Sequence, residues 1–193
     1  MRILSTLAFL LITASSFSQS IVVKPYLQNA EPTSMHVMWE TSSAAASEVQ
    51  YGTTTALGTT VQATLATGSG NSRVCDANLT GLQPATKYYY KAVTGNTESS
   101  MYHFRTPPLK SSNASFNIVA MSDMQQDWQH TTVFNDIIDD NLIPYINQKF
   151  GSDLSEHLAY FVIPGDLVQT GSVYSSWAST FFEPAEDLLS YVP

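Results

Sequence analysis

The sequence predicts a β-sandwich followed by the start of an α/β domain, and three observations support this. Residues 21–107 contain short runs in which apolar and polar residues alternate, separated by clusters of Gly, Ser, Thr and Asn. Residues 115–193 contain two nearly continuous apolar runs around a helix-like segment, which is typical of parallel strands. The charge is also uneven, because residues 19–110 hold six Lys/Arg against five acids, whereas residues 111–193 hold one against eleven.

The composition excludes several classes of protein. With 193 residues and 44% hydrophobic residues, the chain is long enough for one domain or two small ones and too apolar to be disordered. A net charge of −8 argues against a nucleic-acid-binding surface, which needs clustered Lys and Arg. Cys75 is the single cysteine, so we expect neither an intramolecular disulfide nor a cysteine zinc site, and we expect Cys75 in the core.

The first 18 residues have the composition of a signal peptide. Met1 and Arg2 give a positive start, an apolar stretch follows over Ile3–Ala14, and small serines come next. That stretch is too short to span a bilayer, and no longer apolar stretch follows. We therefore expect residues 1–18 to be removed, with no membrane span, and the mature protein to be secreted, periplasmic or extracellular.

The sandwich region is expected to contain about seven short strands. Met35, Val37 and Trp39 alternate with His36, Met38 and Glu40, which gives a period of two over six residues, as on a half-buried strand. Trp39, Tyr88 and Tyr90 are interpreted as core or corner aromatics, with a sugar-stacking platform as the alternative. We expect His36 and His103 on the surface. The predicted strands cover Ile21–Leu27, Met35–Glu40, Glu48–Tyr51, Arg73–Leu79, Lys87–Val93 and Met101–Arg105.

A linker and a β-α-β unit are expected next. Residues 108–114 form part of a Pro- and Ser-rich stretch that continues neither a strand nor a helix. The apolar runs Phe116–Met121 and Leu158–Ile163 are the predicted parallel strands. Between them, apolar residues at helical spacing predict a helix over Val133–Leu142, which Pro144 interrupts or restarts.

Two aspartates follow these strands directly. Asp123 comes after the first run and Asp166 after the second, so both are expected at the carboxyl edge of the sheet, where α/β proteins bind ligands. Two neighbouring carboxylates suit a metal pair, and Gly165 would let the chain turn sharply before Asp166. Helix caps and turns are the alternative roles. His130 and His157 are expected on the surface.

The chain resembles the purple acid phosphatases in several of these segments. The resemblance in the sandwich is carried by Lys24–Gln28, Pro32–Met35, Val37–Thr41 and Val49–Gly52. The segment Gly81–Tyr88 resembles the tyrosine corner of fibronectin type III modules, with Tyr88 as the corner residue. The acidic region is similar to the start of the calcineurin-like metallophosphoesterase domain that follows the sandwich in that family.

The resemblance implies a metal-dependent phosphoester hydrolase with a small phosphate ester as substrate. Two divalent or trivalent ions (Fe, Zn or Mn) would be held, with Asp123 as a terminal ligand and Asp166 as the bridging ligand. No catalytic residue beyond metal ligands is implied. Gln125 takes the position of a histidine in the first motif and is a candidate ligand or a residue that holds a metal-bound water; a plain role at the edge is the alternative.

The chain also departs from the family. Gln169 takes the position of the tyrosine ligand, and Tyr174 has the wrong spacing to replace it, so no purple colour is expected. The histidine motifs that follow Asp166 in the family are not found before Pro193. We therefore expect a catalytic domain that is incomplete, loosely packed and inactive in this chain alone. The alternative is an exported, non-catalytic β-sandwich module for binding or adhesion with a degenerate appendage.

Overall fold

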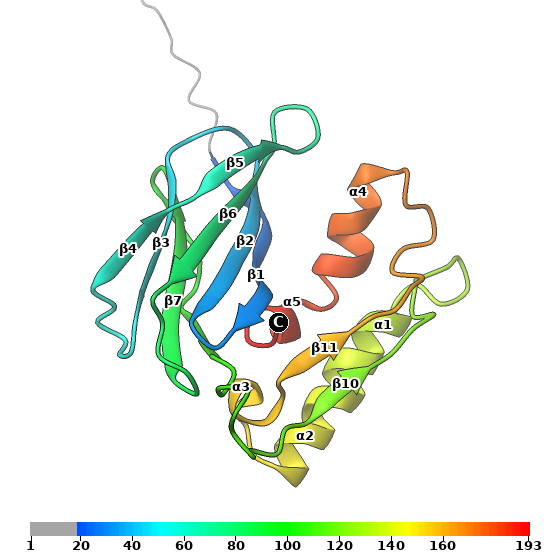
Figure 1. Ribbon diagram of the computed structural model, residues 1–193. Helices are drawn as coiled ribbons and strands as arrows, with labels where there is room; N and C mark the ends of the chain where they lie inside the picture. Colours follow the sequence, from blue (N-terminus) through cyan, green and yellow to red (C-terminus); the bar gives the residue numbers. More distant parts are fainter. Residues whose placement is uncertain (1–18) are drawn as a thin grey trace, which may run out of the picture.

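The computed structural model describes residues 19–193, so the predicted signal segment 1–18 lies outside the described residues. Two antiparallel sheets pack face to face and form a β-sandwich (Figure 1). The first sheet has the order β1-β2-β6-β5. Its strands are β1 (Ile21–Glu31), β2 (Ser34–Thr41), β6 (Arg73–Thr80) and β5 (Thr64–Thr67).

The second sheet has the order β4-β3-β7-β8, and β9 also pairs with β7. All six predicted strands are present. The strands that the sequence did not predict are β4, β5 and β8, because they are short, rich in Thr and lack buried alternation. The strands of this sheet are β4 (Thr59–Gln62), β3 (Ser47–Gly52), β7 (Lys87–Thr94), β8 (Thr97–Glu98) and β9 (Tyr102–Arg105).

The core of the sandwich contains the residues that alternation placed there. Trp39 and Tyr90 are fully buried, and Cys75 is buried as expected. The indole N–H of Trp39 donates to Thr94 Oγ1 at 2.9 Å, which satisfies its polar atom inside the core. The backbone N–H of Gln83 donates to the Tyr88 hydroxyl at 3.0 Å. This contact confirms the predicted tyrosine corner, which ties the turn to β7.

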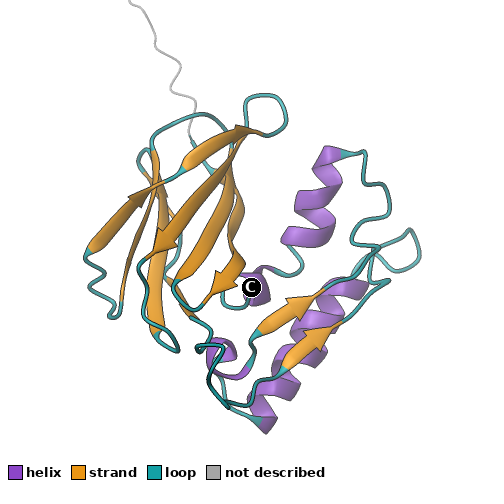
Figure 2. Cartoon of the chain, in the orientation of Figure 1, coloured by secondary structure: helices purple, strands orange, loops and turns teal. Residues whose placement is uncertain are grey.

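A two-stranded parallel sheet lies beyond the sandwich (Figure 2). Strand β10 (Ile118–Ala120) pairs with β11 (Tyr160–Val162), with Val119 opposite Phe161. The helical segments α1, η1, α2 and α3 connect them, so the predicted strand–helix–strand order is observed. Their bounds are α1 (Val133–Asn135), η1 (Asp136–Leu142), α2 (Ile143–Lys149) and α3 (Leu154–His157).

Pro144 restarts the connecting helix without ending it. Segment η1 is a π-helix, and the N–H of Ile143 donates to the carbonyl of Ile138, five residues earlier. Pro144 follows this π-type turn directly, and the backbone stays helical through Leu142 and Ile143 into α2. Phe134, Ile138 and Ile146 are buried along this helix. The predicted apolar stripe is therefore the face that packs on the sheet.

A second helical layer follows β11 and was not predicted. It consists of α4 (Tyr174–Trp177), η2 (Ala178–Phe182) and α5 (Glu186–Leu189). Phe181 and Leu188 join Phe134 in one buried cluster, against which Val119 and Phe161 pack. One face of the β10–β11 sheet is therefore covered, while Ile118 and Val162 on the other face are exposed, so the expectation of an incompletely packed unit holds for that face. Within residues 19–193, no helix is long and apolar enough to cross a membrane.

The helices after β11 also attach to the sandwich. The buried hydroxyl of Tyr90 donates to the Ser190 carbonyl at 2.7 Å, and the Ser190 hydroxyl donates to the Pro25 carbonyl at 2.7 Å. The rings of Tyr26 and Phe182 lie 4.7 Å apart. These contacts hold the C-terminal residues between the two regions.

The surface prediction for His103 holds only in part, because its side chain is 24% exposed, as is that of His36. Its Nε2 lies 2.9 Å from Asp153 Oδ1, and its ring packs on Tyr191 at 4.9 Å. The reason is that α3 brings acidic residues onto the outer face of β7 and β9. His36 is half-buried, with its Nδ1 2.8 Å from Asp76 Oδ1. His130 is exposed as expected.

His157 is half-buried at the end of α3, where its Nε2 lies next to the backbone of Gly151. The surface prediction for His157 therefore holds only for part of its ring.

Candidate metal centre at the carboxyl ends of β10 and β11

The two predicted ligands follow neighbouring parallel strands. Asp123 lies three residues beyond the end of β10, and Asp166 lies four residues beyond the end of β11. The N–H of Met121 donates to the Val162 carbonyl at 3.1 Å, which extends the pairing toward Asp123. The Ser122 hydroxyl donates to the Gly165 carbonyl at 3.3 Å. The structure therefore joins the two loops at the carboxyl edge of the sheet, with both aspartates exposed.

Both aspartates have left-handed backbone conformations. Their φ angles are +58° at Asp123 and +52° at Asp166, and they are the only non-glycine residues with positive φ in residues 115–193. Asp tolerates this region better than most residues, but the conformation still costs on the order of 1 kcal/mol. Such strain often marks functional sites, so the matched conformation supports a shared role.

The role predicted for Gly165 is wrong. Gly165 does not have a positive φ, and a Cβ placed on it would meet no atom within 4 Å. The sharp change of direction occurs at Asp166 itself. The backbone therefore does not require glycine at position 165, although its carbonyl receives the hydrogen bond from Ser122.

Gln125 contributes a polar atom that lacks a partner. Its Oε1 is buried and has no hydrogen-bond partner among the described residues. A buried acceptor without a donor costs about 1–3 kcal/mol, so it is usually satisfied by an ion, a water or a ligand. Gln125 follows the buried Met124 in the loop that begins with Asp123, two residues earlier. The amide oxygen is thus available to a cation or to a donor.

These donors fit part of a metal site. Two carboxylates and an amide oxygen are the ligand types that hard and borderline cations prefer. Such ions take four or more ligands, however, and no group of three or more His, Cys, Asp or Glu side chains suited to a metal exists in the described part of the chain. A complete centre needs further ligands.

Tyr174, which has the wrong spacing to replace the tyrosine ligand, contacts the sandwich. Gln169 is exposed in the loop after Asp166, and Tyr174 begins α4. The Tyr174 hydroxyl donates to Glu40 Oε1 of β2 at 3.1 Å. Burial and the neighbouring Glu40 carboxylate both raise the pKa of Tyr174. The Tyr174 side chain is therefore a neutral phenol that is hydrogen-bonded to the sandwich.

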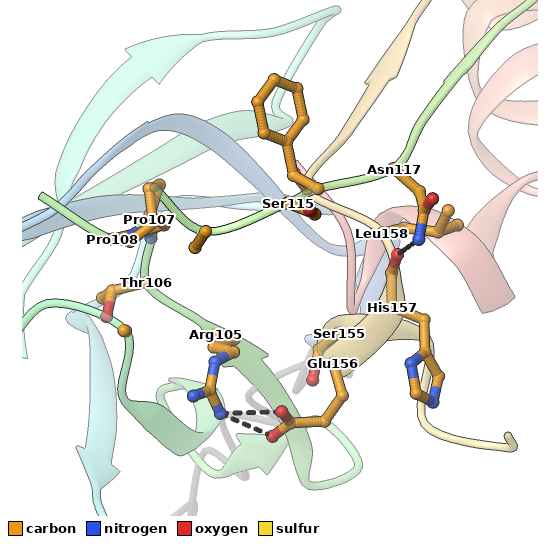
Figure 3. A pocket seen from close by; sticks show the side chains of 14 residues that line it. Arg105, Thr106, Pro107, Pro108, Ser115, Asn117, Ser155, Glu156, His157 and Leu158 are labelled. Atoms are coloured by element: carbon orange, nitrogen blue, oxygen red, sulfur yellow. Dashed lines mark hydrogen bonds and ion pairs between the residues drawn. The ribbon is translucent and has the colours of Figure 1, made fainter. Parts of the chain in front are cut away.

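A pocket of 230 Å³ lies at the opposite ends of these strands. It is lined by the linker, the residues before β10 and the residues around α3 (Figure 3). Arg105 lines it and donates from one guanidinium nitrogen to both carboxylate oxygens of Glu156, at 3.0 and 2.7 Å. Asn117 donates to the His157 carbonyl at 3.0 Å. Because ligands of α/β sheets bind at the carboxyl ends, this pocket is a join between regions and not the candidate centre.

Sequence reasoning missed the charged cluster around Asp153. Its carboxylate accepts hydrogen bonds from Lys87 Nζ and from the backbone and hydroxyl of Ser155, and it also contacts His103. Burial raises the pKa of the Asp153 carboxyl, but the bonds from Lys87, Ser155 and His103 outweigh it and hold the pKa well below its usual range. The sequence feature that could have pointed to this cluster was the excess of acidic residues in residues 111–193, compared with the balanced charge of residues 19–110.

Comparison with known proteins supports the sandwich assignment. Residues 22–106 match the family model of the Purple acid Phosphatase, N-terminal domain. No curated protein matches the chain.

Solved structures are also similar to the chain. The structure of PhoD is 12% identical with a TM-score of 0.54, and the match covers 93% of this chain and 39% of that one. The short sensor-domain structure of the anti-sigma factor RsgI4 of Pseudobacteroides cellulosolvens is 19% identical with a TM-score of 0.38, and covers 49% of this chain and 100% of that one.

PhoD therefore shares the fold over most of this chain, which spans 39% of the length of PhoD. The family match and the two packed sheets agree on the first region. Residues 22–106 are therefore similar to the N-terminal domain of purple acid phosphatases and fold as a β-sandwich.

Proposed function

We propose that this chain is the N-terminal part of an exported, metal-dependent phosphoester hydrolase that acts on small phosphate esters. The observation that carries the proposal is the joined pair of strand-end loops with Asp123 and Asp166 in the same left-handed conformation. This pair directly follows a region similar to the N-terminal domain of purple acid phosphatases. Two independent features therefore favour the same class of enzyme.

Asp123 and Asp166 are the residues that would hold the metal ions (Fe, Zn or Mn), with Asp166 shared between two of them. When bound, the ions would supply Lewis acidity toward the phosphate and the attacking water. Gln125 would offer its unpartnered amide oxygen to an ion or to a water in the site. Ser122 would act as a positioning residue, because its hydroxyl donates to the Gly165 carbonyl and so links the two loops.

Asp123 and Asp166 determine how strongly this chain can bind metal by itself. Two carboxylates neutralise cation charge and leave room for an anionic phosphate, but they hold a transition metal weakly without imidazole ligands. The 193-residue chain should therefore bind metal weakly and lack turnover. Hydrolysis requires a longer gene product that contains this chain and brings further ligands.

Metal binding by the chain itself tests the proposal. Mn²⁺ titration followed by electron paramagnetic resonance should show a weak site, and Asp123→Asn and Asp166→Asn should each weaken it by about tenfold or more. Asparagine tolerates the left-handed conformation, so these variants remove charge while keeping the backbone. Asp140→Asn is the matched control, because Asp140 is an exposed carboxylate on the connecting helix.

Equal Mn²⁺ affinity in the wild-type chain and both aspartate variants would overturn the metal assignment. In that case the exported binding or adhesion module, with its α/β region as an appendage, becomes the better description.

A further inference from the structure

The loop that follows β11 is attached near both of its ends. It covers residues 163–173, joins β11 to α4, and is called the Asp166 loop below. Near its start, the Gly165 carbonyl accepts the hydrogen bond from the β10 loop at 3.3 Å. Just after its end, Tyr174 begins α4, and its hydroxyl donates to Glu40 Oε1 of the sandwich at 3.1 Å. Asp166 therefore lies between an attachment to the neighbouring loop and an attachment to the other region.

Glu40 is a buried carboxyl group on β2, with 7% of the residue exposed. Among the residues that the structure describes, the Tyr174 hydroxyl is the only group that donates a hydrogen bond to this carboxyl. Burying a carboxyl group costs free energy unless a donor replaces the water that it loses. Helix α4 lies next to the sheet that contains β2 (Figure 1). The sandwich therefore holds an acceptor that the α/β region satisfies.

Gly68 leaves the space in which this contact forms. A Cβ placed on Gly68 would lie 2.8 Å from Glu40 Oε1, 2.9 Å from the Tyr174 hydroxyl oxygen and 2.2 Å from Ser72 Oγ. The Gly68 N–H donates to the Ser72 carbonyl at 3.1 Å, which closes the turn between β5 and β6. The Tyr174 hydroxyl is thus received by a turn and a strand of the sandwich, at a point that has no room for a further atom.

Packing holds Tyr174 only in part, because the residue is 42% exposed. Its neighbours along the chain are bonded to one another. The Val173 N–H donates to the Thr170 carbonyl at 3.0 Å, and the Trp177 indole N–H donates to the Gly171 carbonyl at 3.0 Å. These bonds tie the end of the Asp166 loop to the first turn of α4. A restraint on the Tyr174 hydroxyl is therefore passed to the loop.

We propose that Glu40 is a positioning residue for the Asp166 loop and that it acts through the Tyr174 hydroxyl. The sandwich then sets the place of one side of the candidate metal centre. As a contribution to metal binding, the inference rests on the proposed function. The restraint on the loop does not require a metal, so it can be measured without one.

The test follows hydrogen exchange in the full chain by NMR in EDTA. Two protons report on the loop, the Val173 amide and the Trp177 indole N–H. In Tyr174→Phe both should exchange at least about fivefold faster, because the bond to Glu40 is lost. Tyr145→Phe is the matched control, since Tyr145 is a 52% exposed tyrosine on α2, and it should leave both rates unchanged.

Substitutions on the sandwich side test the same contact from the other partner. Glu40→Leu keeps a similar volume without an acceptor, so the two reporter protons should exchange faster, as in Tyr174→Phe. Glu40→Gln keeps an oxygen that accepts from the phenol and should restore slow exchange. Gly68→Ala removes no polar group, and its backbone has no positive φ, but its Cβ would displace the Tyr174 hydroxyl and should also speed exchange. The amide of the buried Val49 should not exchange faster in any variant.

Unchanged reporter exchange in Tyr174→Phe or in Glu40→Leu would overturn the proposal. Faster exchange at Val49 by the same factor would also overturn it, because the substitution would then loosen the whole chain and not the loop. Equally fast exchange in Glu40→Gln and Glu40→Leu would show that the hydrogen bond is not what holds the loop.

Mn²⁺ titration of the same variants separates this inference from the proposed function. Tyr174→Phe should weaken Mn²⁺ binding, though by less than Asp166→Asn, because it moves a ligand and removes none. A chain that binds no Mn²⁺ would contradict the proposed function. Faster exchange of the two reporter protons in EDTA would still support the positioning role of Glu40.

Discussion

The two regions of this molecule differ in how completely their sheets are covered. In the sandwich, each sheet covers the other, and Trp39, Tyr90 and Phe104 are fully buried between them. In the α/β region, helices cover one face of β10 and β11, while Ile118 and Val162 on the other face are exposed. The first region therefore has a core of its own, whereas the second has half of one. The candidate metal centre lies on the second.

The difference separates the region with a complete core from the region in which we propose the metal centre. The sandwich satisfies its polar core atoms internally, as in the bond between Trp39 and Thr94. The α/β region leaves the Gln125 amide oxygen without a partner and places two aspartates in strained conformations. An unpartnered polar atom and strained backbone are expected where a ligand or further polypeptide completes a site.

The largest expected effect is on turnover. In a gene product that continues past Pro193, Asp166→Asn should abolish hydrolysis of p-nitrophenyl phosphate, because one carboxylate would serve two ions. Asp140→Asn is the control and should retain full activity. Metal analysis of the purified proteins should show loss of one or both ions only in Asp166→Asn. A variant with full metal content and turnover would contradict the role of Asp166.

The sandwich should show the largest effect on stability. Trp39→Ala should lower the free energy of unfolding by about 3–5 kcal/mol, because it leaves a cavity and deprives Thr94 of its donor. Trp128 is 81% exposed, so Trp128→Ala should change the free energy by less than about 0.5 kcal/mol. Urea denaturation followed by circular dichroism measures both. Similar losses in the two variants would argue against a sandwich core built around Trp39.

Much of the fold, and less of the site, could be predicted from the sequence. Alternation identified β2, whose apolar residues such as Val37 are buried on one face, and β7 was identified as a strand-like run that includes the buried Tyr88. Strand β5 was missed, since all four of its residues are exposed and no pattern of burial shapes them. The order of apolar runs placed Asp123 and Asp166 at one edge, because parallel strands share their carboxyl ends.

Contacts between the regions could not be predicted in the same way. His103 and Asp153 are 50 positions apart, and their pairing depends on how α3 packs on β9. The role given to Gly165 failed for a related reason. The residue type permits a positive φ, but the chain geometry decided that Asp166 adopts it.

The charged cluster between the regions should have a moderate, pH-dependent effect. Asp153 has a lowered pKa, so its charge stabilises the folded state above the unfolded pKa of about 3.9 and loses this effect as pH falls below it. Asp153→Asn should therefore cost about 1 kcal/mol at pH 5–7, after solvent screening, and less at pH 3. Thermal unfolding at several pH values measures this difference. A cost that grows toward pH 3 would contradict the assigned sign.

The smallest expected effect compares the two faces of the parallel sheet. Ile118 and Val119 are neighbours on β10, but Ile118 is 53% exposed while Val119 packs on the helical cluster. Threonine keeps the branched shape that strands favour and adds a hydroxyl. Ile118→Thr should change the free energy of unfolding by less than about 0.5 kcal/mol, whereas Val119→Thr should cost about 1–2 kcal/mol, because its hydroxyl enters an apolar contact.

The exposed face adds a second readout to the same pair of variants. Ile118→Thr removes apolar surface that a hydrophobic dye can bind, so dye fluorescence should fall in the 193-residue chain while its stability is kept. Val119→Thr removes no exposed surface and should leave dye binding unchanged or raise it through loosened packing. If Ile118→Thr instead cost as much stability as Val119→Thr, the face would be covered in solution. The contrast between a closed sandwich and a half-covered sheet would then not hold.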